Sequence, residues 1–177
     1  MKVAKIKTLL KSTKFNQESA VQGWVKTFRA NRFISLNDGS SLENLQCVVD
    51  FDSLEESFIK RITSGAALHL EGKLVKSQGS GQTIELQVKK IKIYGDSDPE
   101  KYPIQPKKHS LEFLREKAHL RIRTSTFAAV MRIRSALSFA VHKFFQEKGF
   151  FYVNTPIITG SDAEGAGEMF RVTSLHP

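Results

Sequence analysis

Three residues in the first half of the chain have side chains suited to holding an unpaired nucleotide base. Phe33, Gln46 and Glu85 each lie in a run of alternating apolar residues, at a position that the alternation places on the polar side. An aromatic ring can stack on a base for ~1–3 kcal/mol, while an amide and a carboxylate can form hydrogen bonds with base edges. Because a carboxylate repels phosphate, Glu85 would contribute to base reading and not to backbone affinity.

The same residues also have an ordinary structural explanation. An exposed Phe on a strand often packs against a cross-strand neighbour, and Gln or Glu on a sheet is commonly just solvated. Arg29 is harder to place, because the run FRANR is expected to leave the ladder there and the direction of its side chain does not follow from the pattern. Basic residues at strand ends are mostly surface charge. Alternation alone leaves both interpretations of this face open.

Two further carboxylates lie near the end of the chain, in the stretch GSDAEGAGEMF from Gly160 to Phe170. Glu164 and Glu168 are four residues apart, among residues with almost no side chain. Glycine tolerates backbone conformations that other residues resist, so EGAGE is typical of a flexible acidic turn. Glu168 stands where the chain becomes apolar again, which favours a structural role for it.

Alternating residues in the first half of the chain predict a β-rich domain. The alternating runs are bounded by turn residues, as in NDGSS and GSGQ, which is the usual signature of strands joined by loops. Alternation also predicts that Ile34, Leu45 and Leu86 point inward, on the side opposite the candidate base-binding residues. The five predicted strands are Ala20–Phe28, Phe33–Asn37, Leu45–Phe51, Ala67–Lys76 and Thr83–Tyr94.

A helix is predicted between the third and fourth strands, in SLEESFIKRITSG. Its apolar residues repeat at helical spacing behind an N-terminal cap at Ser53, and Gly65 is expected to end it. Three strands, a helix and two more strands follow the order of an OB-fold, a five-stranded barrel that often binds oligonucleotides. We therefore assign residues 1–94 to an all-β OB-fold barrel. The apolar residues of the predicted helix are Leu54, Phe58, Ile59 and Ile62.

The second half of the chain has a different pattern. Residues 95–110 hold three of the five prolines and no apolar periodicity, which predicts an extended linker of limited flexibility. Ser125–Lys148 is predicted as a long helix, because apolar residues recur there in steps of three or four over an unusually wide face. Gly149 should end this helix, and FFYVNTP should form a short strand that stops at Pro156, since proline cannot donate to a ladder.

Composition limits the possible classes of function. Of the 177 residues 40% are apolar, enough for a packed core, and the formal charge of +9 suits a partner rich in phosphate. No apolar run approaches the roughly 18 residues of a membrane span, and the N-terminus lacks the features of a signal peptide, so we expect a cytoplasmic protein with no membrane partner. The single Cys47 excludes an internal disulfide and, alone, a metal cluster, so no metal site is expected.

Three segments carry a resemblance to a known family. GWVKTFRANRFISLNDGSSLENLQCVV resembles the anticodon-binding domain of the class II synthetase subgroup that contains the aspartyl, asparaginyl and lysyl enzymes. HLRIRTSTFAAVMRIRSALSFAVHKFFQEKGFFYVNTPIIT is similar to the family's first signature motif, a long helix followed by a strand that ends at proline. DAEGAGEMF is similar to the segment that separates asparaginyl enzymes from their relatives. The whole chain thus resembles the N-terminal part of an asparaginyl-tRNA synthetase.

This resemblance implies roles for the candidate residues. In the subgroup, an aromatic at the position of Phe33 stacks on the central anticodon base, and residues at the positions of Arg29, Gln46 and Glu85 help to read the anticodon. Glu164 corresponds to a carboxylate on a substrate-covering loop, where it would meet the α-ammonium of asparagine. The glycines beside it would let such a loop close and open.

The resemblance also implies a homodimer and a second domain. The helix and strand of the first motif form the dimer interface in the family, and Pro156 corresponds to a proline that packs where two active sites approach. Such an interface would account for the wide apolar face of Ser125–Lys148. We accordingly expect a Pro-containing hinge at residues 95–118 and the beginning of an α+β class II catalytic domain at residues 119–177.

The implied reaction attaches asparagine to tRNA(Asn) through an asparaginyl-adenylate, using ATP and Mg²⁺. The family's second and third motifs, which supply ATP-binding arginines, have no counterpart in these 177 residues. We therefore expect this chain to contain no catalytic residue, to bind neither ATP nor Mg²⁺ by itself, and to be inactive alone.

Two alternatives remain open. A free-standing OB-fold module that binds single strands or tRNA would end naturally after Pro177, whereas an asparaginyl enzyme would continue into an ATP-binding motif. An aspartyl-tRNA synthetase relative would carry a PEGAR-like segment, and EGAGEMF argues against it.

Overall fold

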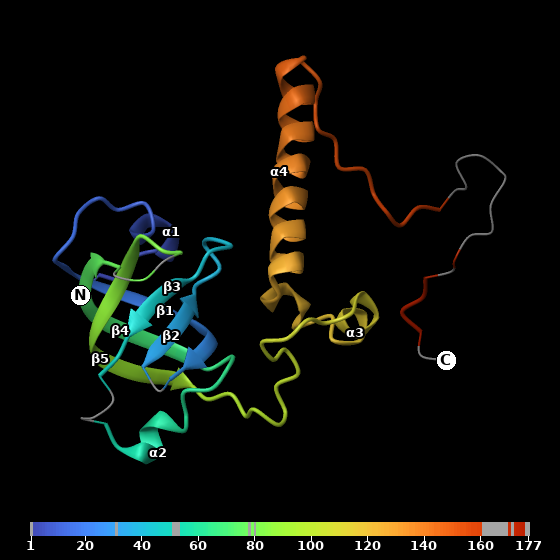
Figure 1. Ribbon diagram of the computed structural model, residues 1–177. Coiled ribbons are helices and arrows are strands. Elements are labelled where there is room, and N and C mark those ends of the chain that lie inside the picture. The colour runs from blue at the N-terminus through green and yellow to red at the C-terminus, as the bar shows by residue number, and fades with distance from the viewer. Residues whose placement is uncertain are drawn as a thin grey trace. The chain divides into compact units, whose positions relative to one another are not determined.

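The computed structural model describes residues 2–30, 32–50, 54–77, 79, 81–160, 170 and 172–175. Five strands in the first half of the chain form a closed barrel with the strand order β1-β2-β3-β5-β4 (Figure 1). A short helix, α2 (Glu56–Ile59), follows β3 and precedes β4 in the chain, so the predicted OB-fold barrel is confirmed. The strands are β1 (Gln17–Arg29), β2 (Phe33–Asn37), β3 (Leu45–Val48), β4 (Ala67–Lys76) and β5 (Ile84–Gly95).

Strand pairing gathers the apolar residues of the barrel into one core. β1 pairs antiparallel with β2 and β4, β2 with β3, and β4 with β5, while β3 and β5 are parallel. Side chains alternate along each strand, and Ile34, Leu45 and Leu86 are fully buried as predicted. Val88, two residues after Leu86 on β5, is partly buried against this core. The residues between the buried ones therefore face outward.

A helix before the first strand, α1 (Ile6–Leu9), was not predicted, because four residues are too few to show a helical period. Its Ile6 and Leu9 side chains are buried in the barrel core. The turn after β2 also holds it: the Ile6 N–H donates to Asp38 Oδ2 at 3.0 Å, and the Lys7 N–H donates to Ser40 Oγ at 2.9 Å. Tertiary contacts, and not local propensity, position this helix.

Asp38 gives this attachment a pH dependence. Burial acts to raise the pKa of Asp38, but hydrogen bonds from Ser40 and the Ile6 N–H, together with the charge of Lys5, hold the pKa below its ordinary value of 3.8. A carboxylate whose pKa is lower in the folded state contributes stability that is complete above pH 3.8 and is lost as the pH falls through the folded-state pKa.

We expect Asp38→Asn to lower the free energy of unfolding at pH 7 by about 1 kcal/mol, since the charged acceptor is lost from a part-buried and partly screened site. The difference from the wild type should shrink as the pH falls below about 4. Urea unfolding from pH 7 to pH 2 measures both effects. Glu43→Gln, in the same turn, is the matched control; a difference that persists undiminished at pH 2 would contradict the assignment.

The predicted helix between β3 and β4 is wrong in its length. α2 covers only Glu56–Ile59 and has no side-chain cap, while the expected cap, Ser53, lies outside the described residues. After Ile59 the chain turns, so that Ile62 is buried in the core, and Gly65 lies in a turn with φ +90° where its N–H donates to the carbonyl of Val25. Contact with the barrel replaces the further helical turns that periodicity alone predicts.

The segment after the barrel is attached to it by polar contacts. Arg61 forms two hydrogen bonds with Asp96, at 2.8 and 2.9 Å, and the hydroxyl of Thr63 donates to the carbonyl of Ser97. Two short elements in this region were not predicted: α3 (Leu111–Glu116), with Leu114 buried, and the 3-10 helix η1 (Arg121–Arg123).

The long helix α4 spans Ser125–Glu147, one residue shorter than predicted, and Gly149 follows it with φ +83°. By internal contacts the chain divides into Met1–Ile133 and Arg134–Pro177, so α4 contributes to both units. No helix of the described part of the chain is both long and apolar enough to cross a membrane. Five apolar side chains along α4 are 46–61% exposed: Val130, Ile133, Leu137, Val141 and Phe144.

The strand predicted for residues 150–156 is absent, and this prediction was wrong. The segment has no regular secondary structure and is exposed throughout, including Pro156. A strand requires a neighbouring strand for its hydrogen bonds, and every strand in the described ranges belongs to the barrel. Glu164 and Glu168 lie outside the described residues.

Candidate nucleic-acid interface

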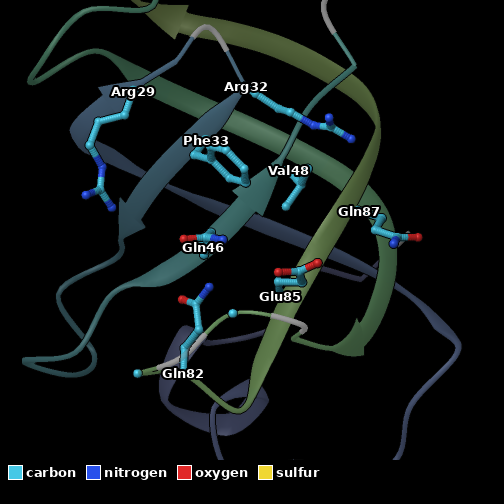
Figure 2. Close-up of a pocket in the computed structure, with 10 residues that line it drawn as sticks. Arg29, Arg32, Phe33, Gln46, Val48, Gln82, Glu85 and Gln87 are labelled. Atoms are coloured by element: carbon cyan, nitrogen blue, oxygen red, sulfur yellow. The ribbon is translucent and has the colours of Figure 1, made fainter.

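An open pocket of about 910 Å³ lies on the outer surface of the barrel. It brings together Phe33, Gln46 and Glu85, which alternation places on the polar side, and Arg29, whose direction the pattern left open. Figure 2 shows Phe33, Gln46 and Glu85 on three neighbouring strands, with Gln87 pointing away from the centre of the group. The other lining residues are Arg32, Val48, Gly79, Gly81, Gln82 and Gln87. We call this site the Phe33 pocket.

Strand register places these side chains next to one another. In the antiparallel pair β2–β3, Phe33 lies opposite Val48, and in the parallel pair β3–β5, Gln46 lies opposite Glu85. Side chains opposite each other on neighbouring strands are close enough to touch. The pocket therefore has an aromatic and aliphatic part, from Phe33 and Val48, beside a polar part, from Gln46 and Glu85.

The loop before β5 holds the Glu85 carboxylate in place. The hydroxyl of Ser77 donates to Glu85 Oε2 at 3.1 Å, and Ser77 Oγ itself accepts from Gln82 Nε2 at 3.3 Å and from the Gly79 N–H at 3.2 Å. Among the described residues nothing donates to Glu85 Oε1. One carboxylate oxygen is thus oriented by the protein, while the other can accept a hydrogen bond from a ligand.

Two arginines provide positive charge at the edge of the pocket. Arg29, at the end of β1, lies opposite Phe33 in the antiparallel pair, and Arg32 directly precedes β2. Both are exposed, and neither forms an ion pair within 4.0 Å with another described residue. Guanidinium groups that are free of carboxylates can contact phosphate oxygens, which complements base contacts inside the pocket.

Sequence reasoning did not find the other residues of the pocket. Gln87 follows Glu85 by two positions on the same strand, so alternation could have found it. Arg32, Gln82, Gly79 and Gly81 belong to loops, whose course does not follow from a period.

The arrangement can bind one or more unpaired bases. The partly exposed ring of Phe33 can stack on any base, whereas the amide of Gln46 and the second oxygen of Glu85 can distinguish base edges by their donors and acceptors. Arg29 and Arg32 can fix the phosphates that flank such a base. The pocket offers no nucleophile or acid–base pair, and no group of three or more metal-ligating side chains occurs in the part of the chain that the structure describes.

Comparison with known proteins extends this result beyond the barrel. Residues 20–94 match the family model described as an OB-fold nucleic acid binding domain, and residues 110–177 match the model of class II tRNA synthetases (D, K and N). An asparagine–tRNA ligase of Parabacteroides distasonis is 54% identical over 177 residues, covering 98% of this chain. The chain belongs to the class II tRNA synthetase family. A Nostoc asparagine–tRNA ligase is 53% identical over 97% of the chain.

Solved structures of this synthetase family share the fold. Asparaginyl-tRNA synthetase from Pyrococcus horikoshii, complexed with asparaginyl-adenylate, has a TM-score of 0.79 over 94% of this chain and 39% of its own, at 22% identity. The aspartyl-tRNA synthetase of Entamoeba histolytica has a TM-score of 0.69 at 16% identity. The chain spans 38% of the length of the Parabacteroides and Nostoc ligases.

Proposed function

We propose that this chain forms the anticodon-binding domain, the hinge and the beginning of the catalytic domain of a cytoplasmic asparagine–tRNA ligase. The proposal assigns residues 1–94 to the first part, 95–118 to the second and 119–177 to the third. Its main support is the Phe33 pocket, where a partly exposed aromatic ring, the polar groups of Gln46 and Glu85 and two arginines without an ion pair to a described residue line one open surface. Relatives that are about half identical over nearly the whole chain are asparagine–tRNA ligases.

Within this function, Phe33 stacks on the central anticodon base, and Gln46 and Glu85 form hydrogen bonds with anticodon bases. Arg29 contacts the anticodon strand from the edge of the pocket. Two features support these roles: the cross-strand pairing of Gln46 with Glu85, and the hydrogen bond that fixes one Glu85 oxygen and leaves the other accessible. A base that matches both groups binds better than one that leaves either unpaired.

The whole enzyme would join asparagine to tRNA(Asn) through an adenylate, with ATP and Mg²⁺ as the source of activation. Such catalysis depends mainly on positioning the reactants and neutralising charge. We assign the described residues no step of that reaction. Glu164 is proposed to bind the α-ammonium of asparagine, and Pro156 to lie at the interface of a homodimer.

Filter binding of this chain to tRNAs that differ only in the anticodon tests the proposal. We expect the asparagine anticodon to bind about fivefold or more tighter than one with a changed central base, because one lost stacking or edge contact costs about 1–3 kcal/mol. Each comparison is made at one stated salt concentration, since the phosphate contribution varies with salt. Equal affinity for every anticodon would instead indicate a non-selective OB-fold module.

A further inference from the structure

A second pocket, of about 440 Å³, lies on the barrel and shares no lining residue with the Phe33 pocket. It is bounded by the outer sides of β1, β4 and β5 and by the segment before α1. We call it the Trp24 pocket. The lining residues that matter for its chemistry are Lys5, Gln22, Trp24, Asp38, Ala67 and Tyr94.

Two aromatic side chains of this pocket are exposed. The exposed fraction is 37% for Trp24 and 54% for Tyr94. On the β4 side of Trp24 the sheet carries small residues, since Trp24 pairs with Ala67 on β4 and Ala67 pairs with Gly95 on β5. This row of small residues leaves open space next to the indole ring, where side chains of ordinary size would otherwise pack.

The indole ring is held in position by the segment that precedes α4. The guanidinium of Arg123 lies 3.5 Å from the centre of the Trp24 ring, and the Lys26 ammonium donates to the carbonyl of Arg123. These contacts restrict the rotamers of Trp24 before any ligand arrives. A ring that is already ordered loses little conformational entropy when a ligand stacks on it.

A hydrogen-bond chain orients the polar groups of the pocket. Gln22 Nε2 donates to His69 Nδ1 at 3.2 Å and to Tyr94 Oη at 3.3 Å, and His69 Nε2 lies 3.2 Å from Glu71 Oε1. Because Glu71 can only accept, His69 donates from Nε2 and accepts at Nδ1. Gln22 Oε1 accepts no hydrogen bond from a described residue, and the Tyr94 hydroxyl proton remains available. The pocket therefore presents one fixed acceptor and one donor beside its two rings.

The segment next to this pocket is strongly basic. Lys5 borders the pocket, while the Asp38 carboxylate nearby already accepts hydrogen bonds from Ile6 and Ser40. Buried Ile6 and Leu9 attach the segment to the barrel. Five lysines in the first 14 residues are exposed and form no ion pair within 4.0 Å in the described ranges: Lys2, Lys5, Lys7, Lys11 and Lys14.

From this combination we infer that the Trp24 pocket is a second RNA-binding site, which takes an unpaired nucleotide. The base stacks against Trp24 and Tyr94, its edge bonds to Gln22 Oε1 and the Tyr94 hydroxyl, and the flanking phosphates lie on Lys5 and its neighbouring lysines. The positive charge of the segment favours a nucleic acid over an apolar ligand or a basic peptide. This site is separate from the Phe33 pocket and does not depend on the function proposed for that pocket.

The sequence supplies a direct probe, because Trp24 is the only tryptophan among the 177 residues. In the test, the chain is titrated with a fluorescently labelled adenosine hexanucleotide; indole emission reports on the Trp24 pocket, and label anisotropy reports on total binding. We expect saturable quenching of Trp24 that persists in Phe33→Ala. Tyr94→Ala should lower the affinity obtained from the quenching isotherm about 5- to 150-fold, because one stacking partner is lost. Tyr94→Phe should retain most of the affinity.

The slope of log K against log salt concentration is measured from the same isotherms. Lys5→Gln should reduce the magnitude of this slope by about 0.7, the contribution of one phosphate contact on a single strand. Lys60→Gln, which removes an exposed lysine at the C-terminal cap of α2, is the matched control and should leave the slope unchanged. Thermal unfolding checks that each variant is folded.

Binding that appears in anisotropy without quenching, or quenching that disappears with Phe33→Ala, would overturn the second site and leave the anticodon proposal intact. Quenching by hexaglutamate but not by RNA would overturn it in favour of an acidic peptide ligand. Conversely, Trp24 quenching together with equal affinity for every anticodon would support the second site while contradicting the function proposed for the Phe33 pocket.

Discussion

Phe33→Ala should weaken binding of this chain to the asparagine tRNA about 5- to 150-fold. The ring is the aromatic surface of the Phe33 pocket, and loss of one base–aromatic stack costs about 1–3 kcal/mol. Phe33 is an outward-facing residue of β2, opposite Val48, so its removal leaves the buried core of the barrel unchanged. The affinity should fall while its salt dependence stays the same, because a ring neutralises no phosphate. Filter binding across a salt series measures both quantities.

Two variants make this test specific. Leu42→Ala truncates an apolar side chain in the turn between β2 and β3 that is 49% exposed and outside both pockets, and should bind as tightly as the wild type. Phe33→Trp keeps an aromatic face and should retain most of the affinity. If Phe33→Ala and Leu42→Ala lose the same affinity, Phe33 is not a stacking residue.

The double substitution Ile133→Glu and Leu137→Glu should convert a dimer of this chain into monomers. Both side chains lie on the exposed apolar line of α4 and are 61% exposed in the single chain. If α4 forms a twofold interface, each substitution occurs twice, and loss of about 1.5 kcal/mol or more at each of the four positions raises the dimer dissociation constant roughly 10,000-fold or more. Sedimentation equilibrium over a concentration series gives this constant.

A control with the same added charge separates the interface from general repulsion. Ser135→Glu combined with Gln146→Glu adds two carboxylates to α4 away from the apolar line, and should change dimerisation far less. A wild-type chain that is monomeric at every concentration, or equal dissociation in both double variants, would contradict the proposed interface. In the first case the exposed apolar line must be covered by another part of the protein.

The strands of the barrel could be predicted from the sequence because each is half buried. A period of two in apolar residues is sufficient to say that Ile34 and Leu86 point inward and that Phe33 and Glu85 point outward. Local periodicity was much less useful for the short helices. Contact with the barrel shortens α2, and the four residues of α1 form a helix only because Ile6 and Leu9 fit the core. It failed at residues 150–156, since a strand needs a partner that periodicity does not supply.

The sequence by itself determined the alternation that sends Phe33, Gln46 and Glu85 to the outside of a five-stranded barrel, and the positive charge that suits a nucleic acid. Only the tertiary structure decided that these side chains meet, because the pairing of β2 with β3 and of β3 with β5 joins positions up to 52 residues apart, from 33 to 85. The same holds for the Trp24 pocket, whose walls come from the N-terminus, β1, β4 and β5. Alternation along a strand indicates on which face of the sheet a side chain lies, whereas the register between strands determines which side chains are neighbours on that face.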